Sequence, residues 1–298
     1  MSNSLSPSSI VVAVDGSDDA DRAVRWAAEQ AFRERRPLVV MTAVGGPAAT
    51  PVAWPGVVTP SAQDLIESGQ AVADAALGLV HDLYPGLTVE AAVRLGDPRV
   101  ELTEVSRHVH LIVIGSRGRG VVRSKVLGSV SAAVSRDAAC PVIVCRPRRS
   151  SRSEDHGILV GADATAESIP VLEFAFGQAS LTNEPLTIMH TIWDERAALV
   201  GPELTLLRES GLEEHRLLLS ESVAGLRSKY PDVAADLVLA RGVADDCLAD
   251  RTDQWSLIVV GRHPVDTLLR LVTGAVATAV VERAHTNVAV VPQADPQR

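Results

Sequence analysis

The strongest constraint in this sequence is an internal repeat, because the two halves of the chain follow the same pattern. The apolar residues 10–14, which run into Asp15, recur 148 positions later. Residues 111–115 recur in the same way 146 positions later. So many matches at a nearly constant offset predict two copies of one domain.

The repeat divides the 298 residues into two domains of ordinary size. We predict a first domain over residues 1–147, a linker over residues 148–156 and a second domain over residues 157–298. The join is polar and arginine-rich, contains Pro147 and lacks apolar periodicity. Because aromatic residues make up only 3% of the chain, the core of each domain is expected to be aliphatic.

Within the first copy, continuous apolar runs alternate with segments that carry the period of an α-helix. Apolar strands that are separated by helices are typical of a parallel sheet covered on both faces. We therefore predict an α/β fold with two tandem doubly wound, Rossmann-like domains, each containing a five-stranded parallel sheet. The predicted strands are residues 10–14, 38–44, 88–95, 110–115 and 141–146, and the predicted helices are residues 18–36, 61–84, 98–108 and 128–138.

The first predicted helix carries start and stop signals. Ser17 is a suitable N-cap, acidic residues fill the first turn, and Pro37 prevents the helix from continuing. The 3.6-residue period places five apolar side chains on the face that is expected to be buried. These are Val24, Ala27, Ala28, Ala31 and Phe32.

The charge balance argues against a general nucleic-acid or anionic-membrane binder. The chain has 37 acidic and 28 basic residues, a net charge of −9, whereas such binders need a broad positive field. No run of 18 apolar residues and no signal peptide are visible. Three cysteines do not make a disulfide framework. We therefore predict a cytoplasmic protein.

Glycine, serine and basic residues are concentrated between the predicted fourth strand and the helix that follows it. In open parallel sheets, ligands bind beyond the carboxyl ends of the strands. Glycines let backbone N–H groups approach an anion, and a helix N-terminus adds unpaired donors and a partial positive charge. This segment therefore predicts a phosphate-binding loop. Its candidate residues are Gly115, Ser116, Arg117, Gly118, Arg119, Gly120, Lys125, Gly128, Ser129, Val130 and Ser131.

Two common phosphate motifs are excluded by the residues themselves. Lys125 is followed by valine rather than serine or threonine, so the loop is not a Walker motif. The turn after the first strand is acidic and holds one glycine, Gly16, which does not make a dinucleotide fingerprint.

The spacing of Gly115, Gly118, Gly128 and Ser129 matches the glycine signature of the universal stress protein family. The chain resembles the tandem two-domain, ATP-binding members of that family over residues 8–147 and 157–292. The resemblance implies that ATP is the ligand, with Mg²⁺ or Mn²⁺ as a possible companion near Asp15. It places the adenosine beside Ala13, Asp15 and Ala43.

The resemblance also implies how two copies pair. The fifth strands, residues 142–146 and residues 288–291, are expected to meet and form an intramolecular pseudo-dimer, and a homodimer of chains is the other expected assembly.

The second copy departs from the glycine pattern. Pro264 replaces the second glycine, and alanines replace the two serines of the loop. Proline removes an N–H donor and each alanine removes a hydroxyl, so we predict weak or absent nucleotide binding in this half. The residues that keep a weaker second site are Gly161, Asp163, Thr191, Gly261 and Gly274.

The leading functional hypothesis is an ATP-binding stress-response or regulatory protein, with the nucleotide between the first and fourth strands of the first domain. No residue set committed to phosphoryl transfer is evident, so turnover is expected to be slow and no catalytic residue is assigned. A ligand-free interaction scaffold and a slow ATP hydrolase or nucleotidyl transferase remain alternatives. Residues 45–60 read as a long loop, either a lid over the ligand or a partner surface. His108, His110 and His190 read as structural histidines.

Overall fold

The computed structural model describes residues 5–45, 60–118, 127–147, 156–193, 203–205, 212–250, 252–263 and 270–294; for residues 203–205 and 270–275 only the backbone is described. The chain separates into two compact units, residues 1–145 and 146–298. The predicted linker bounds stay a prediction, because residues 148–155 lie outside the described part.

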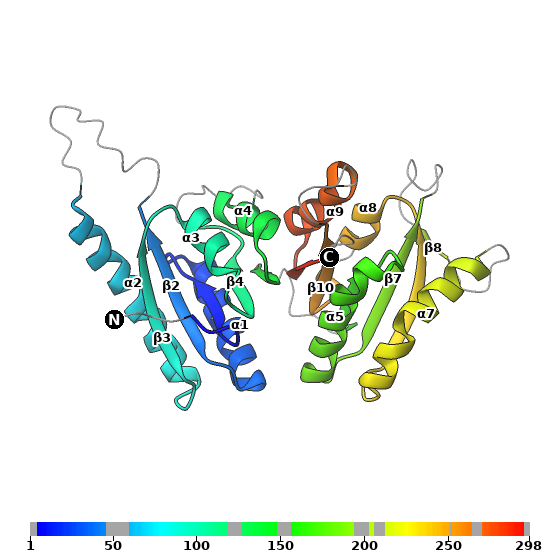
Figure 1. The fold of residues 1–298 in the computed structure, drawn as a ribbon, viewed down its shortest axis with the longest axis horizontal. Helices are drawn as coiled ribbons and strands as arrows, with labels where there is room; N and C mark the ends of the chain where they lie inside the picture. Colours follow the sequence, from blue (N-terminus) through cyan, green and yellow to red (C-terminus); the bar gives the residue numbers. More distant parts are fainter. Residues whose placement is uncertain are drawn as a thin grey trace. The chain divides into compact units, whose positions relative to one another are not determined.

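The first unit is a parallel sheet with helices on both faces (Figure 1). Its strands follow the order β3-β2-β1-β4-β5, so the direction of winding reverses between β1 and β4. The strands are β1 (Ile10–Ala13), β2 (Leu38–Val44), β3 (Val89–Leu95), β4 (Leu111–Gly115) and β5 (Val142–Cys145). The predicted doubly wound domain with five parallel strands is confirmed for this half.

The helices of the first unit form two layers around that sheet. Helix α1 (Asp18–Glu34) packs beside α2 (Ala62–Leu83), whereas α3 (Pro98–Val105) packs beside α4 (Ser129–Asp137). Three of these helices begin at a side-chain cap, provided by Ser17, Ser61 and Asp97. The N-cap of α4 is Gly128, so no side chain caps the start of this helix.

The second unit repeats the first and adds an edge strand. Its parallel strands follow the order β9-β7-β6-β10-β11, and β8 (Glu203–Thr205) pairs antiparallel with β9. The parallel strands are β6 (Ile158–Gly161), β7 (Leu186–Ile192), β9 (Ala235–Arg241), β10 (Leu257–Arg262) and β11 (Asn287–Pro292). The five predicted parallel strands are therefore present in this unit too, and β8 is an additional antiparallel strand, too short to show a period in the sequence.

The helices of the second unit take the places of those in the first. They are α5 (Ile169–Thr182), α7 (Glu213–Lys229), α8 (Ala244–Ala249) and α9 (Arg270–Arg283). A short 3₁₀ turn, Ala166–Ser168, precedes α5, which carries a proline in its first turn. Proline is tolerated there because the first helical N–H groups have no partner within the helix.

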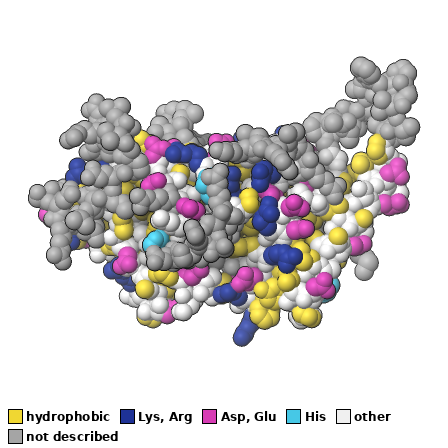
Figure 2. Space-filling view, turned by 180° about the vertical axis from the view of Figure 1, so that it is seen from behind, with side chains coloured by type: hydrophobic (Ala, Val, Ile, Leu, Met, Phe, Trp, Pro, Cys, Tyr) yellow, Lys and Arg dark blue, Asp and Glu magenta, His cyan; other side chains and the backbone are white. Residues whose placement is uncertain are grey.

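The core of each unit is aliphatic. Every residue of β4 and β5 is buried, and so are the first three residues of both β1 and β6. Continuous burial explains why these strands are apolar throughout rather than alternating. Charged side chains of both signs are interspersed on the face shown in Figure 2. No described helix is long and apolar enough to cross a membrane.

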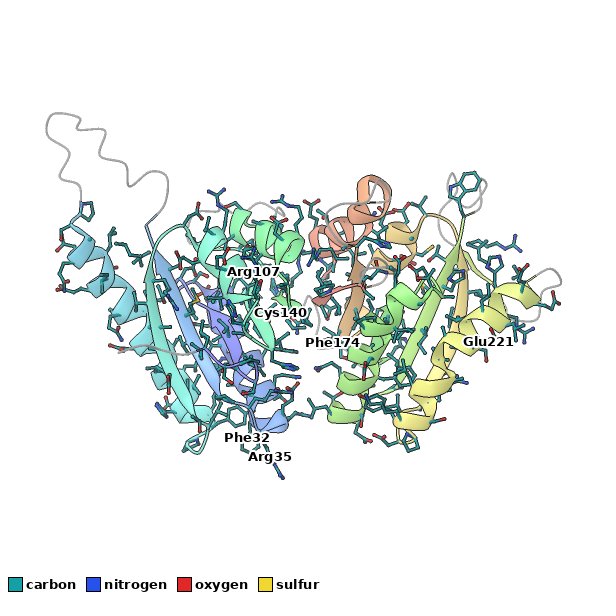
Figure 3. All side chains as sticks on the ribbon, viewed as in Figure 1. Phe32, Arg35, Arg107, Cys140, Phe174 and Glu221 are labelled. Atoms are coloured by element: carbon teal, nitrogen blue, oxygen red, sulfur yellow. The ribbon has the colours of Figure 1, made fainter. Side chains whose placement is uncertain are left out.

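Helix α1 confirms its predicted start but corrects one predicted core residue. The Ser17 hydroxyl accepts a hydrogen bond from the N–H of Ala20 (3.3 Å), and Arg35 ends the helix in the left-handed conformation before Pro37. Phe32 is 56% exposed, so the prediction that it belongs to the buried face was wrong. Its ring packs on Tyr84 beyond α2, with ring centroids 4.9 Å apart, instead of on the sheet (Figure 3).

We expect the two phenylalanines Phe32 and Phe176 to differ sharply in their contribution to stability. Phe176 in α5 is fully buried, so Phe176→Ala should lower the free energy of unfolding by about 3–5 kcal/mol. Phe32→Ala removes mainly a surface ring contact and should cost about 1 kcal/mol. Urea unfolding of both full-length variants measures the difference, and equal losses would contradict the placement of these rings.

Candidate functional site

The first unit has a cavity at the carboxyl edge of its sheet, where the strand order reverses. Its volume is about 460 Å³, within the usual range of sites for small molecules. The ends of β1, β2 and β4 and the start of α4 line it, together with residues of α2 and α3. The lining residues that were predicted from the sequence are Ala13, Asp15, Ala43, Gly115, Arg117, Gly118, Gly128, Ser129, Val130 and Ser131.

One wall of the cavity arises because β2 extends further than β1. In the pairing of these strands the last residue of β1, Ala13, lies opposite Met41. Strand β2 continues to Val44, so Ala43 has no residue of β1 opposite it. Backbone groups of Ala43 on that side therefore face the cavity instead of a neighbouring strand. The rest of the lining on this side includes apolar residues such as Val14, Met41 and Val72, together with the polar Thr42.

The opposite end of the cavity is the N-terminus of α4. Gly128 is its N-cap and accepts the first helical hydrogen bond, from the N–H of Ala132 (2.9 Å). The N–H groups of Ser129, Val130 and Ser131 are the first three of the helix and have no acceptor within it. Since no side chain caps this end, these donors and the helix dipole are directed at the cavity.

Glycine is needed at two positions of the loop because other atoms of the protein approach their backbone closely. A Cβ atom on Gly118 would lie 2.5 Å from Oδ2 of Asp15, and a Cβ on Gly115 would lie 2.7 Å from the backbone of Asp19. Real side chains do not tolerate such distances, so a larger residue at position 118 must displace the Asp15 carboxylate or the loop, and one at position 115 must displace backbone. The Asp15 carboxylate also accepts a hydrogen bond from the N–H of Ser17 (3.1 Å).

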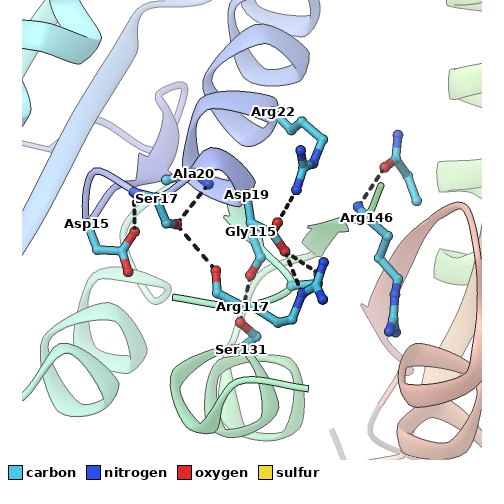
Figure 4. A network of polar contacts seen from close by, with 11 residues as sticks. Asp15, Ser17, Asp19, Ala20, Arg22, Gly115, Arg117, Ser131 and Arg146 are labelled. Carbon is cyan, nitrogen blue, oxygen red and sulfur yellow. Dashed lines mark hydrogen bonds and ion pairs between the residues drawn. The ribbon is translucent and has the colours of Figure 1, made fainter. Parts of the chain in front are cut away.

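The buried carboxylate of Asp19 ties the loop to α1 (Figure 4). The Ser116 hydroxyl donates to Asp19 Oδ2 (2.6 Å), and Arg117 Nε donates to the same oxygen (3.2 Å). Arg22 from the next turn of α1 pairs with the other oxygen. Burial alone would raise the pKa of Asp19, but the hydrogen bonds from Ser116 and Arg117 bring it below its ordinary value.

Two predicted phosphate ligands have different local roles in this arrangement. Ser116 is buried and does not line the cavity, because its hydroxyl is directed at Asp19. The hydroxyl of Ser131 donates to the carbonyl oxygen of Gly115 (2.7 Å), so its proton holds α4 against β4. The backbone N–H of Ser131 remains directed at the cavity as described above. The predicted residues Arg119, Gly120 and Lys125 lie outside the described residues.

Among the residues of this region that the sequence analysis missed, Asp19 and Thr42 matter most. Asp19 was noted only as an acid in a first helical turn, although the repeat places Glu167 at the matching position of the second half. There Glu167 Oε2 lies 3.4 Å from His263 Nδ1, which mirrors the pairing of Asp19 with Arg117. A comparison of the two copies would have found this pair. Thr42 was also missed, because a single threonine in an apolar strand carries no signal.

The corresponding region of the second unit holds its own side chains. Leu248 Cδ1 lies 2.7 Å from the place of a Cβ on Gly161, and the Gln293 side chain lies 3.0 Å from that of Gly261. Gln293 Nε2 donates to Asp163 Oδ2 (3.3 Å). The predicted weaker site is therefore partly occupied by the protein itself.

The remaining residues of the weaker site lie near that region. Thr191 is half-buried in β7, and Gly274 belongs to α9, where only the backbone is described. Thr165 donates two hydrogen bonds to Asp163, from its backbone N–H (2.9 Å) and its hydroxyl (2.7 Å). Burial would raise the pKa of Asp163, but these hydrogen bonds bring it below its ordinary value. His190 donates from Nδ1 to the carbonyl of Ala162 (3.0 Å), which agrees with a structural histidine.

The fold and the cavity define a class of protein: a tandem doubly wound α/β chain with a ligand-sized cavity at the switch point of its first sheet. The sequence model of the Universal stress protein family matches residues 8–146 and 156–292, and the chain belongs to this family. A universal stress protein of Mycolicibacterium smegmatis is 30% identical over 294 residues, covering 95% of this chain and 96% of the relative.

Two further comparisons agree with this assignment. A universal stress protein of Mycobacterium tuberculosis strain H37Rv is 30% identical over 292 residues, covering 95% of this chain and 97% of the relative. The crystal structure of a universal stress protein from Archaeoglobus fulgidus has the same fold, with a TM-score of 0.68, 19% identity and coverage of 98% of both chains.

The lowered pKa of Asp19 leads to a prediction about stability and pH. Since the folded-state value lies below the ordinary 3.8, the ionised carboxylate stabilises the fold above about pH 4. This contribution is lost as the pH falls through the folded-state pKa. Asp19→Asn should therefore lower the free energy of unfolding by about 2 kcal/mol at pH 7, and by less at pH 3.

The matched control is Asp18→Asn, because Asp18 occupies the same helical turn but is exposed. It should change stability by about 0.5 kcal/mol or less. Urea unfolding of the full-length variants at both pH values makes the comparison. A loss for Asp19→Asn that is as large at pH 3 as at pH 7 would show that the ionised pair is not its source.

Proposed function

We propose that the first unit binds an adenine nucleotide, with ATP as the ligand, and that the protein acts as a nucleotide-dependent stress-response or regulatory protein. The observation that carries this proposal is a single cavity with one apolar end and one end formed by the uncapped N-terminus of α4. An apolar wall suits a flat base, and unpaired helix N–H groups suit phosphate oxygens. Membership of the universal stress protein family is consistent with it.

The residues of the loop support the phosphate end of this proposal. The N–H groups of Ser129, Val130 and Ser131 would donate to phosphate oxygens, and Gly118 leaves the backbone accessible. Arg117 is engaged with Asp19, so we assign it to positioning the loop rather than to direct contact with phosphate. Arg119, Gly120 and Lys125 complete the proposed phosphate contacts from outside the described residues.

Asp15 is the residue that we propose to face a metal ion bound with the nucleotide. Its carboxylate lies against Gly118, and both residues line the cavity. A carboxylate beside phosphate oxygens provides the hard oxygen ligands that Mg²⁺ and Mn²⁺ prefer. Such an ion would neutralise charge between Asp15 and the phosphates.

We propose that nucleotide binding acts by changing the population of conformations, with little turnover. A ligand shifts such an equilibrium only if it binds one state better, and the loop between β4 and α4 is the element that we expect to differ. The predicted pairing of the fifth strands and the predicted homodimer stay predictions.

The proposal predicts one nucleotide per chain. Titration of the full-length protein with ATP and Mg²⁺ should give a stoichiometry of one, because the second region holds its own side chains. Two tight sites per chain would contradict the proposed division between the halves. No binding at millimolar ATP would favour the ligand-free scaffold.

The double variant Gly118→Ala with Ser129→Ala tests the loop. The added Cβ overlaps the carboxylate of Asp15, so either that carboxylate or the loop must shift, and we expect affinity for ATP to fall about ten-fold or more. The matched control is Gly78→Ala on α2, where an added Cβ meets nothing within 4 Å. That control should bind ATP as tightly as the natural chain. Equal affinity in the double variant would refute the assignment of this loop.

We expect hydrolysis of ATP to be slow. Since typical enzymes turn over at about ten per second, steady-state phosphate release below about one per second separates a regulatory binder from an enzyme. The measurement uses the full-length protein with saturating ATP and Mg²⁺. Faster release would favour the alternative of an ATP hydrolase.

A further inference from the structure

The wall of the cavity contains a polar atom that has no partner in the protein. Thr42 lies in β2, is 3% exposed and lines the cavity. Its hydroxyl oxygen is buried and makes no hydrogen bond with any residue that the structure describes. Buried hydroxyls are nearly always hydrogen-bonded, so an unpartnered one in the wall of a cavity points to a group that enters from outside the protein.

Helix α2 packs closely against Thr42. The methyl carbon of Thr42 lies 3.5 Å from the place of a Cβ on Gly69 of α2, so Thr42 faces that helix. A Cβ on Gly69 would also lie 2.9 Å from a methyl group of Val44. Glycine at this position therefore lets α2 lie close over the end of β2 without closing the cavity, which both Gly69 and Thr42 line.

The repeat shows what happens when these two positions change. In the second half His190 takes the place of Thr42 in the strand, and His215 takes the place of Gly69 in the helix. The His190 ring donates to the carbonyl of Ala162, and its centroid lies 5.4 Å from that of His215. Two histidine rings in contact with each other thus occupy the positions at which the first half has Thr42 and Gly69. One of these rings, that of His190, is hydrogen-bonded to the residue that follows β6.

We propose that the hydroxyl of Thr42 hydrogen-bonds the base of the bound nucleotide and makes the first half selective for ligands that carry a nitrogen heterocycle. A hydroxyl donates one hydrogen bond and accepts others, so it can pair with a ring nitrogen or an exocyclic amine. This inference rests on the proposed function, because it identifies which part of the ligand meets Thr42. A hydrogen bond from Thr42 to the base would distinguish nucleotides from bare polyphosphates. A polyphosphate has no base and would contact only the N-terminus of α4.

The variant Thr42→Val tests the proposal in the full-length protein, because valine keeps the shape of threonine and removes the hydroxyl. Affinity for ATP should fall about ten-fold, as expected for the loss of one buried hydrogen bond to the ligand. Affinity for inorganic tripolyphosphate, which has no base, should stay unchanged. Thr42→Ser keeps the hydroxyl and should bind ATP within about three-fold of the natural chain.

A second readout excludes a merely structural role. Without nucleotide, Thr42→Val should melt at the same temperature as the natural chain or higher, since it removes a buried polar atom that has no protein partner. A lower melting temperature without nucleotide, or an equal loss of affinity for ATP and tripolyphosphate, would overturn the inference.

The failure of this inference is distinguishable from the failure of the proposed function. If the natural chain binds ATP and Thr42→Val binds it equally well, the role of Thr42 is refuted while the nucleotide site stands. If the natural chain binds neither ATP nor tripolyphosphate, the proposed function fails, and the inference fails with it.

Discussion

The geometry of the first half depends on one buried carboxylate. Asp19 stands in the first turn of α1 and accepts hydrogen bonds from Ser116 and Arg117, which directly follow β4. Because the carboxylate is buried and ionised, it needs these donors, and the donors fix where the chain leaves the sheet. From that fixed point the chain reaches Gly118 beside Asp15, and Gly128 donates its N–H to the carbonyl of Ser116. The position of the α4 N-terminus therefore follows from a contact that no ligand needs to touch.

The two halves show how one fold supports different sites. Both keep an acid that follows the first strand and pairs with a basic side chain after the matching later strand, Asp19 with Arg117 after β4 and Glu167 with His263 after β10. Both therefore hold that part of the backbone in a similar way. They differ at the carboxyl edge of the sheet, since the first half has a cavity there and the second has the side chains of Gln293 and His190. The two halves therefore share a fold but differ in the residues at the edge of the sheet where a ligand would bind.

Much of the first half could be predicted from sequence because burial dictates its pattern. Strands buried on both faces are apolar throughout, and the predicted cap at Ser17 comes from a local hydrogen bond. The strand β8 and the exposure of Phe32 could not be predicted in this way, because one is too short for a period and the other depends on where Tyr84 lies. Asp19 and Thr42 escaped for the same reason. Their roles come from partners about 100 residues away or from a missing partner, and neither leaves a local pattern.

The most direct measurement of the central claim is hydrogen–deuterium exchange of the full-length protein with and without ATP and Mg²⁺. The amides of Ser129, Val130 and Ser131 have no acceptor within α4, so they should exchange quickly alone and slowly with nucleotide. Peptides that cover residues 270–277, the matching helix start in the second half, should be unaffected. Protection in residues 270–277 equal to that at the start of α4, or no protection at either place, would contradict the account.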